Sequence, residues 1–178
     1  MAKAEALTPQ EFRQIHEQLL AINATCSDVW YFLYHASLKI GDVLKLTFND
    51  IENGCIRQDR IKGNKALALN EAAISIVTKR QKRFPEDIYL FQSHSNRVKA
   101  RPKAITAIAF NACLRKAAGK VTAKNVSSQS ARRTRAATLL TRGADVEYIS
   151  VMLNHRDVSI TRAWLADDTL TLTQTAAK

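Results

Sequence analysis

The sequence has little of what would place a chain outside the ordinary globular class. Its three cysteines, Cys26, Cys55 and Cys113, are odd in number and far apart. This pattern argues against a disulfide framework or a zinc site and favours a reducing cytoplasm. No apolar run approaches the roughly 18 residues that span a bilayer, and Met1–Glu5 lacks the apolar core of a signal peptide. We therefore expect a cytoplasmic protein without membrane contact.

Glycine and proline are also scarce, at five and three of 178 residues, and the chain has no internal repeat or linker-like stretch. With 46% hydrophobic residues it can bury a substantial core. We expect one domain over residues 1–178, in which residues 166–178 form a flexible or partner-docking tail.

Charge is the most informative property of this chain. It carries 27 basic and 16 acidic side chains, a net charge of +11. The excess is concentrated in residues 57–135, where 19 basic groups face four acidic ones, and both flanking segments are slightly acidic. Such a one-signed field within a folded chain favours a nucleic-acid partner over a generically basic surface, although charge alone does not separate DNA from RNA.

Apolar periodicity and capping signals predict a mainly helical chain. Thr8-Pro9-Gln10-Glu11 reads as a capping box before a helix with Phe12, Ile15, Leu19 and Leu20 on one face. Gly143 reads as the stop of a later helix. The other helices are expected over Ser27–His35, Ile40–Leu46, Glu71–Lys82, 103–118 (with Ile105, Ile108, Ala109 and Ala112 on one face), Ser130–Arg142, Val146–Leu153 and Ile160–Leu165.

Two short extended runs interrupt the helices. They are Gly54–Arg57 and Ala66–Leu69, with Lys62-Gly63-Asn64-Lys65 between them as a hairpin turn. Ile88–Phe91 is a further short extended piece. The fold class is therefore mainly α with a small antiparallel β-sheet.

Three stretches in register carry a family resemblance. They are Ala36–Leu46 with Asn49–Ile51, then Gln129–Thr134 with Ala136–Leu140 and Gly143, and finally Val151–His155 with Ser159–Leu165. In order and spacing they resemble the three signatures of the tyrosine recombinases, or phage integrases, over residues 8–165. The resemblance implies the fold of that family's catalytic domain.

The resemblance also implies a chemistry and its residues. In the family a tyrosine attacks a DNA phosphodiester, two arginines hold the non-bridging oxygens, and a hairpin lysine protonates the leaving oxygen, without metal or cofactor. Arg132 matches the second arginine, Lys62 the hairpin lysine and His155 the histidine of the third signature. Read without the resemblance, Arg132 is a structural partner for Asp42, Lys62 a solvated loop lysine and His155 an interior histidine.

Three positions depart from the family pattern. Lys39 stands where the first arginine belongs and lacks its planar bidentate contact. Gln129 replaces a histidine and cannot relay a proton. Trp164 stands where the tyrosine belongs and has no oxygen; on its own it reads as a packing residue. The tyrosines present elsewhere, Tyr31, Tyr34, Tyr89 and Tyr148, are read as core or rim aromatics.

We therefore expect a protein that binds double-stranded DNA but does not cleave it, and that serves a mobile element as an accessory or regulatory factor. The DNA-binding residues predicted are Arg60, Lys62, Lys65, Arg97, Lys99, Arg101, Arg132 and Arg133. The start near Thr8 resembles short relatives limited to the catalytic domain, so we expect help from a homo-oligomer or an active recombinase partner. The alternatives are a recombinase that borrows a tyrosine from elsewhere and a protein-interaction module with an incidental basic face.

Overall fold

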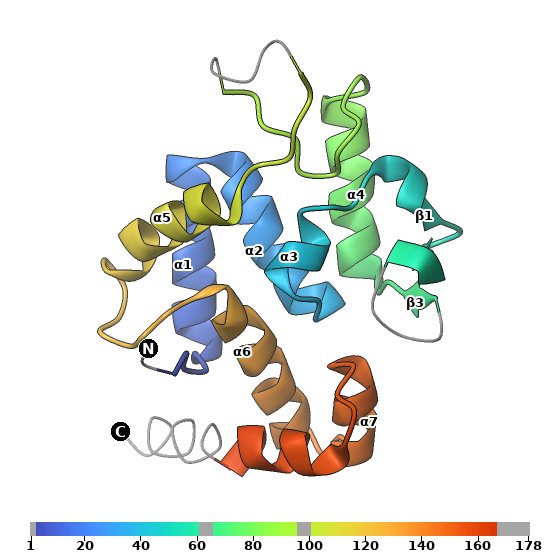
Figure 1. The fold of residues 1–178 in the computed structure, drawn as a ribbon. Coiled ribbons are helices and arrows are strands. Elements are labelled where there is room, and N and C mark those ends of the chain that lie inside the picture. The colour runs from blue at the N-terminus through green and yellow to red at the C-terminus, as the bar shows by residue number, and fades with distance from the viewer. Residues whose placement is uncertain (1–2, 61–65, 96–100, 167–178) are drawn as a thin grey trace.

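Helices form most of the chain in the computed structural model, which describes residues 3–60, 66–95 and 101–166 (Figure 1). The main helices are α1 (Pro9–Ile22), α2 (Ala24–Ala36), α3 (Ile40–Val43), α4 (Glu71–Arg83), α5 (Ala107–Ala118), α6 (Ser128–Thr141) and α7 (Val146–Met152). A last helical segment covers residues 158–166. The predicted mainly helical class is confirmed.

Local capping explains where several helices begin. The Thr8 side chain accepts from the Glu11 amide while Glu11 returns a bond to the Thr8 amide, so the predicted capping box is present. Asn23 ends α1 and caps α2 by accepting from the Cys26 amide. Just after the C-terminal end of α6, Gly143 has φ +85°. The Gly143 and Ala144 amides donate to Leu140 and Leu139, the pattern of a Schellman motif.

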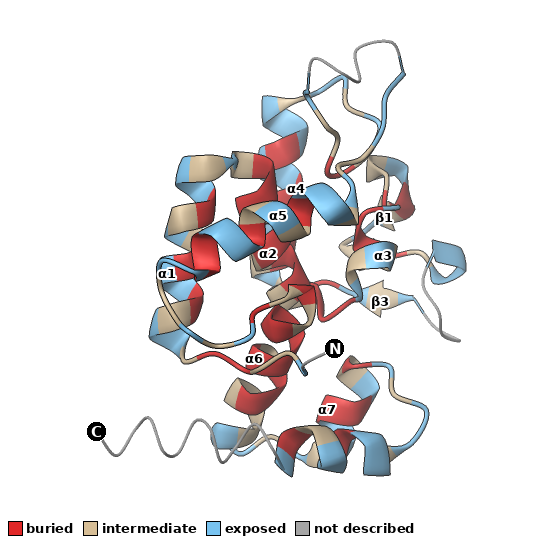
Figure 2. Ribbon diagram, turned by 60° about the vertical axis from the view of Figure 1, so that its left-hand side comes forward, coloured by how far each residue is buried: buried red, intermediate tan, exposed pale blue. Residues whose placement is uncertain are grey.

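The core gathers around α2, whose buried residues include Trp30, Phe32 and Leu33 (Figure 2). Helix α2 packs against α1, α4 and α6. A second, smaller apolar cluster joins Ala136 of α6 to Ile149, Leu153 and Leu165 near the C-terminal end of the described chain. Figure 1 shows α7 and the helical segment after it on the lower side, beyond α6. The molecule thus has one large core and one small one that share α6.

The sheet has three short antiparallel strands in the order β1 (Ile51–Glu52), β2 (Cys55–Ile56) and β3 (Leu67–Ala68). The pairing of β2 with β3 confirms the two extended runs predicted on either side of the Lys62 turn. Strand β1 was not predicted, and it follows a 3₁₀ turn over Phe48–Asp50. The turn Lys62–Lys65 itself lies outside the described residues.

Four details of the helix prediction were wrong. Helix α5 begins at Ala107 rather than 103, with Thr106 as its cap, and buries Phe110 and Leu114. The face of α5 that we predicted to be buried points outward, since Ile108 is 81% exposed. Leu20, assigned to the buried face of α1, is 56% exposed. Helix α3 ends at Val43, three residues early. In α5 the apolar residues occur at helical spacing on two faces, so periodicity did not determine which face is buried.

Among the helices of the described residues, none combines the length and apolar character needed to cross a membrane.

Candidate functional site

Arg132 on α6 is the centre of the site. Its side chain is 2% exposed. Its Nε donates to the Ser37 carbonyl at 2.7 Å and Nη2 donates to the Leu153 carbonyl at 2.9 Å. A longer bond of 3.4 Å runs from Nη1 to the Gln129 side chain. Arg132 therefore ties the end of α2 and the end of α7 to α6 through acceptors that carry no charge.

The positive charge of Arg132 is left without a close counter-charge. Arg57, Arg60, Arg80 and Arg162, by contrast, each lie within ion-pair distance of a carboxylate. Burial lowers the pKa of Arg132 to about 10, and the carboxylate of Asp42 offsets this only in part. The alternative role of Arg132 as an ion-pair partner of Asp42 is therefore not realised at pairing distance.

A cleft of about 160 Å³ opens beside Arg132. Its lining includes Lys39 and Asp42, together with Leu153 and Asn154 from the other side. Lys39 caps α3 and is exposed, so its ammonium can reach into the solvent-filled opening. Arg132 and Lys39 thus supply one buried and one exposed cation to the same small space.

His155 adjoins this cleft and is held by Thr161. The Thr161 hydroxyl, completely buried, lies 2.9 Å from Nδ1 of the imidazole. Burial holds the pKa of His155 below its usual value, and the nearby charges of Arg132 and Lys39 lower it further. A neutral imidazole at pH 7 can accept a proton or a hydrogen bond, but it adds no charge to the cleft.

Trp164, half-buried on the segment 158–166, packs over these groups. Its ring meets the His155 ring edge-on, with centroids 5.0 Å apart. The guanidinium carbons of Arg132 and Arg133 lie 5.7 and 4.8 Å from the ring centroid. These are cation–π distances. The indole offers one N–H donor and no oxygen at this position.

The structure thus brings Lys39, Gln129, Arg132, His155 and Trp164 together, and their roles remain predictions. The sixth predicted position, Lys62, lies outside the described residues. Tyr148 lies on α7, is 59% exposed and is not part of the small core. The rings of Tyr31 and Tyr34 pack at a tilt against the Phe12 ring at the α1–α2 contact. Tyr89 forms an isolated backbone β-bridge with Thr47.

Comparison with known proteins agrees with this geometry. The model of the phage integrase family matches residues 5–170, nearly the whole chain. The chain belongs to the phage integrase family. A curated relative, the probable integrase/recombinase YoeC of Bacillus subtilis (strain 168), is 24% identical over 162 residues, which cover 89% of this chain and 87% of YoeC.

Solved structures share the phage integrase fold. XerA recombinase superposes with a TM-score of 0.74 at 19% identity, over 98% of this chain and 64% of XerA. A lambda integrase dimer bound to a COC′ core site gives 0.73 at 12% identity, over 93% and 49%. The Tn1549 transposon integrase in complex with circular intermediate DNA gives 0.72 at 16%, over 100% and 66%. The chain spans about half to two-thirds of the length of these structures.

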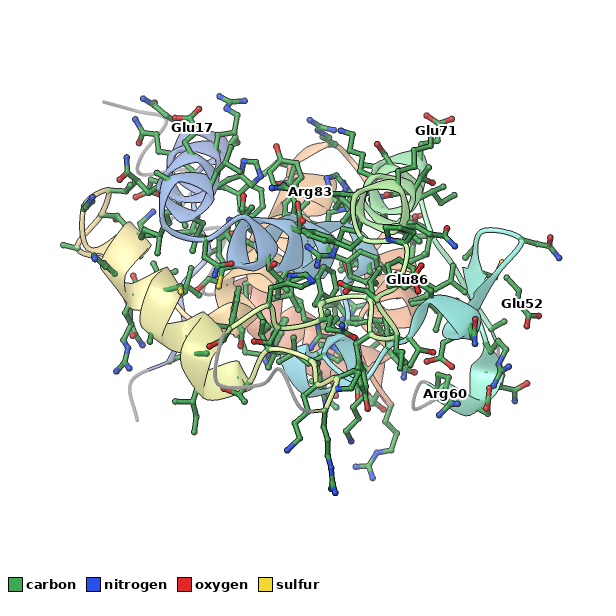
Figure 3. The ribbon with its side chains drawn as sticks, turned by 90° about the horizontal axis from the view of Figure 1, so that it is seen from above. Glu17, Glu52, Arg60, Glu71, Arg83 and Glu86 are labelled. Atoms are coloured by element: carbon green, nitrogen blue, oxygen red, sulfur yellow. The ribbon has the colours of Figure 1, made fainter. Side chains whose placement is uncertain are left out.

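Besides Arg132, the DNA-binding residues predicted for this phage integrase fall into four groups. Arg60 holds the buried Asp50 carboxylate at 2.7 Å, at the sheet end of the molecule where Figure 3 also labels Glu52. Arg101 is exposed and available. Arg133 is 3% exposed and donates to the Trp164 carbonyl, so in this conformation it supports the indole. Lys62, Lys65, Arg97 and Lys99 lie outside the described residues.

Sequence reasoning missed the groups that hold the site in place. The carbonyls of Ser37 and Leu153 are backbone atoms, and no residue type signals them. Thr161 lies within the third signature, between Ser159 and Trp164, so a hydroxyl six residues after His155 was a usable signal. Asp50 was also missed; its burial beneath Arg60 follows from the turn before β1.

Proposed function

We propose that this member of the phage integrase family binds duplex DNA at the Arg132 cleft without cleaving it. The observation that carries the proposal is Trp164: an indole packs against His155 and Arg132 at the position that the family resemblance gives to the nucleophile. A phosphotyrosyl-type intermediate needs an oxygen there, and an indole has none.

The retained groups suit binding better than catalysis. A buried guanidinium without a carboxylate partner gains from an incoming phosphate, because the anion supplies the missing counter-charge in a desolvated place. Lys39 adds a second cation at the cleft but only as a point charge. In the family two cations hold the phosphate, and Arg132 and Lys39 occupy those two positions. We therefore expect the affinity for phosphate to be largely retained.

The losses in chemistry are large by comparison. Removal of one donor to the developing charge costs about 2.7–4 kcal/mol, or 10²–10³ in rate. Loss of general acid–base help costs a further 10²–10⁴ or so. Loss of the nucleophile removes the covalent route altogether. Each loss alone is sufficient to abolish useful turnover.

Duplex DNA is the polyanion we favour because two of the similar structures, the lambda integrase dimer and the Tn1549 integrase, are DNA complexes. The basic excess in residues 57–135 supports the same partner. We extend the proposal to self-association or pairing with an active recombinase, and to a role as an accessory factor of a mobile element in the cytoplasm.

Suicide DNA substrates test the absence of cleavage. The wild-type chain, incubated with nicked duplexes and run on a denaturing gel, should give no covalent adduct. An adduct on the wild-type chain would overturn the inactive assignment and favour a borrowed tyrosine, for which Tyr148→Phe is the first variant to test. The same assay on Trp164→Tyr shows whether nucleophile loss alone is limiting.

A salt titration tests DNA binding separately. If about 6–10 side chains contact phosphates, affinity for a duplex should fall about 10³–10⁵-fold between 50 and 200 mM salt. A flat response, or no binding at low salt, contradicts the proposal and favours the protein-interaction alternative.

A further inference from the structure

We propose that a second pocket, formed by α1, α2 and α6, binds a small aromatic anion: one planar ring bearing a carboxylate or a phosphate. The pocket lies on a face of α6 that differs from the face of Arg132. Thr134 and Thr138 line it, and two residues along an α-helix correspond to a rotation of roughly 200° from Arg132 to Thr134. The proposal therefore does not depend on DNA binding at the cleft.

Aromatic side chains form one wall of this pocket. Phe12, Tyr31 and Tyr34 line it, and the Phe12 ring lies 4.5 Å from the Tyr34 ring and 5.6 Å from the Tyr31 ring. His35 continues the wall, with its ring 5.0 Å from that of Tyr34. A cluster of ring faces and edges at these separations offers an incoming planar ring an offset or edge-on partner.

The charged side chains that line the pocket are all basic. Arg13 and Arg142 line it, and its lining contains no carboxylate. Arg135 lies behind Tyr34, with its guanidinium carbon 5.4 Å from the ring centroid and a buried Nε that has no hydrogen-bond partner among the described residues. Three guanidiniums near one opening, without an acidic neighbour in the lining, favour an anion.

His35 contributes no opposing charge. Burial, reinforced by the charge of Arg135, lowers the pKa of His35 to about 4, so the imidazole is neutral at pH 7. The side chain of Asn70 approaches its Nδ1 at 3.3 Å. His35 therefore serves as a neutral aromatic wall, and the cations at the rim decide the charge of the ligand.

Size limits the ligand. The pocket has a volume of about 190 Å³, and a cavity of roughly 150 Å³ accommodates a benzene molecule. There is room for one ring and its acidic group, but not for a dinucleotide. Phe12 and Thr134 at the base are buried, while Arg13 and Arg142 are exposed. We therefore expect the ring of the ligand to lie near Phe12 and Thr134, and its anionic group to lie near the two exposed arginines.

An NMR titration of the full chain tests this proposal with three probes: benzoate, phenyl phosphate and inorganic phosphate. We expect benzoate or phenyl phosphate to shift the ring signals of Tyr31, Tyr34 and His35 saturably. The probe that binds more tightly identifies the anionic group, an aryl carboxylate or an aryl phosphate. Arg142→Gln should weaken that binding about tenfold, and Arg115→Gln, an exposed arginine on α5 outside the lining, should leave it within about twofold.

Three results would overturn the proposal. One is the absence of saturable shifts with both ring-bearing probes. Another is equal affinity for inorganic phosphate, because the aromatic wall would then play no part. The third is equal weakening by Arg142→Gln and Arg115→Gln, which would mean general attraction to a basic protein. Amide spectra of each variant establish that it is folded.

Discussion

Arg80 and Arg132 are buried to the same degree, at 3% and 2% exposure, in two different regions of the molecule. Arg80, on α4, donates to the Asp28 carboxylate at 2.7 Å and also to the Leu90 carbonyl, and it lies over the Phe84 and Phe91 rings. Arg132 donates to neutral acceptors at the ends of two other helices. One buried charge is compensated by a carboxylate, and the other has no ion-pair partner among the described residues.

The difference predicts, without reference to any motif, that Arg80 is structural and that Arg132 binds an anion. An arginine that only stabilises the fold is expected to have its charge balanced, because an uncompensated buried charge is costly. A site that binds a phosphate needs the opposite arrangement. Four variants, ordered by expected effect, test this distinction.

Arg80→Met should have the largest effect on stability. It leaves the Asp28 carboxylate and the Leu90 carbonyl without their donor, and loss of one member of a buried pair costs about 3–5 kcal/mol. The Asp28 side chain is 35% exposed, so we expect the lower end, about 3 kcal/mol. Urea denaturation measures it. DNA affinity of the folded variant should equal that of wild type; a matching loss of affinity would remove the distinction.

Arg132→Met should show the reverse pattern. Loss of a charge-assisted contact of about 1.5–3 kcal/mol corresponds to roughly 10–150-fold weaker duplex binding. Stability should fall by less than in Arg80→Met, since removal of an uncompensated charge offsets the two carbonyls left unpaired. Fluorescence anisotropy and urea denaturation on the same sample provide both numbers. Arg115→Met, at an exposed position on α5 outside the predicted DNA-binding residues, is the matched binding control. A larger stability loss than in Arg80→Met contradicts the comparison.

Thr161→Val tests how much the hydrogen bond between Thr161 and His155 contributes to stability. The variant keeps the shape of the buried side chain but removes the 2.9 Å bond to His155. The cost should be about 1 kcal/mol, the usual net value of such a bond. Thr78→Val, on the exposed side of α4, is the control and should change stability by no more than about 0.5 kcal/mol. An effect no larger than that of the control means that His155 is positioned by Trp164 packing alone.

Lys39→Met should have the smallest effect on stability, and it tests the electrostatic influence of Lys39 on His155 beside the cleft. Removing a nearby cation should raise the pKa of His155, because the charge of Lys39 is one of the causes that lower it. Because that pKa lies below its unfolded value, wild-type stability falls as pH drops below about 6.5, and the variant should lose less. NMR titration of the imidazole signals measures the shift. The pKa of His35 should not move; an equal shift there would indicate a global change.

The sequence predicted the parts of the fold that depend on neighbouring residues. The capping box at Thr8 and the helix stop at Gly143 need only a few consecutive side chains, and both are present. The fold class and the convergence of the signatures followed from the order of short patterns. The outward orientation of Ile108 could not be predicted, because the choice between two apolar faces is made by α1, about 90 residues earlier in the chain.

The candidate site was predictable in its members but not in its electrostatics. Lys39, Arg132 and His155 were identified by position in the signatures. The acceptors of Arg132 are backbone carbonyls 95 and 21 residues away, and only a fold specifies them. Sequence also offered Asp42 as a partner for Arg132, but in the part of the chain that the structure describes the two do not lie at ion-pair distance. The role of Lys62 stays a prediction.

The bond from Arg132 to the Leu153 carbonyl joins the large core to the small one. The small cluster contains few buried side chains and is connected to α6 through the glycine turn at 143, so its local opening should require less free energy than global unfolding. An anion that restricts the motion of the Arg132 guanidinium also restricts the Leu153 carbonyl, which accepts a hydrogen bond from it. Amide hydrogens of α7, which touch no ligand themselves, should therefore exchange more slowly once the cleft is occupied.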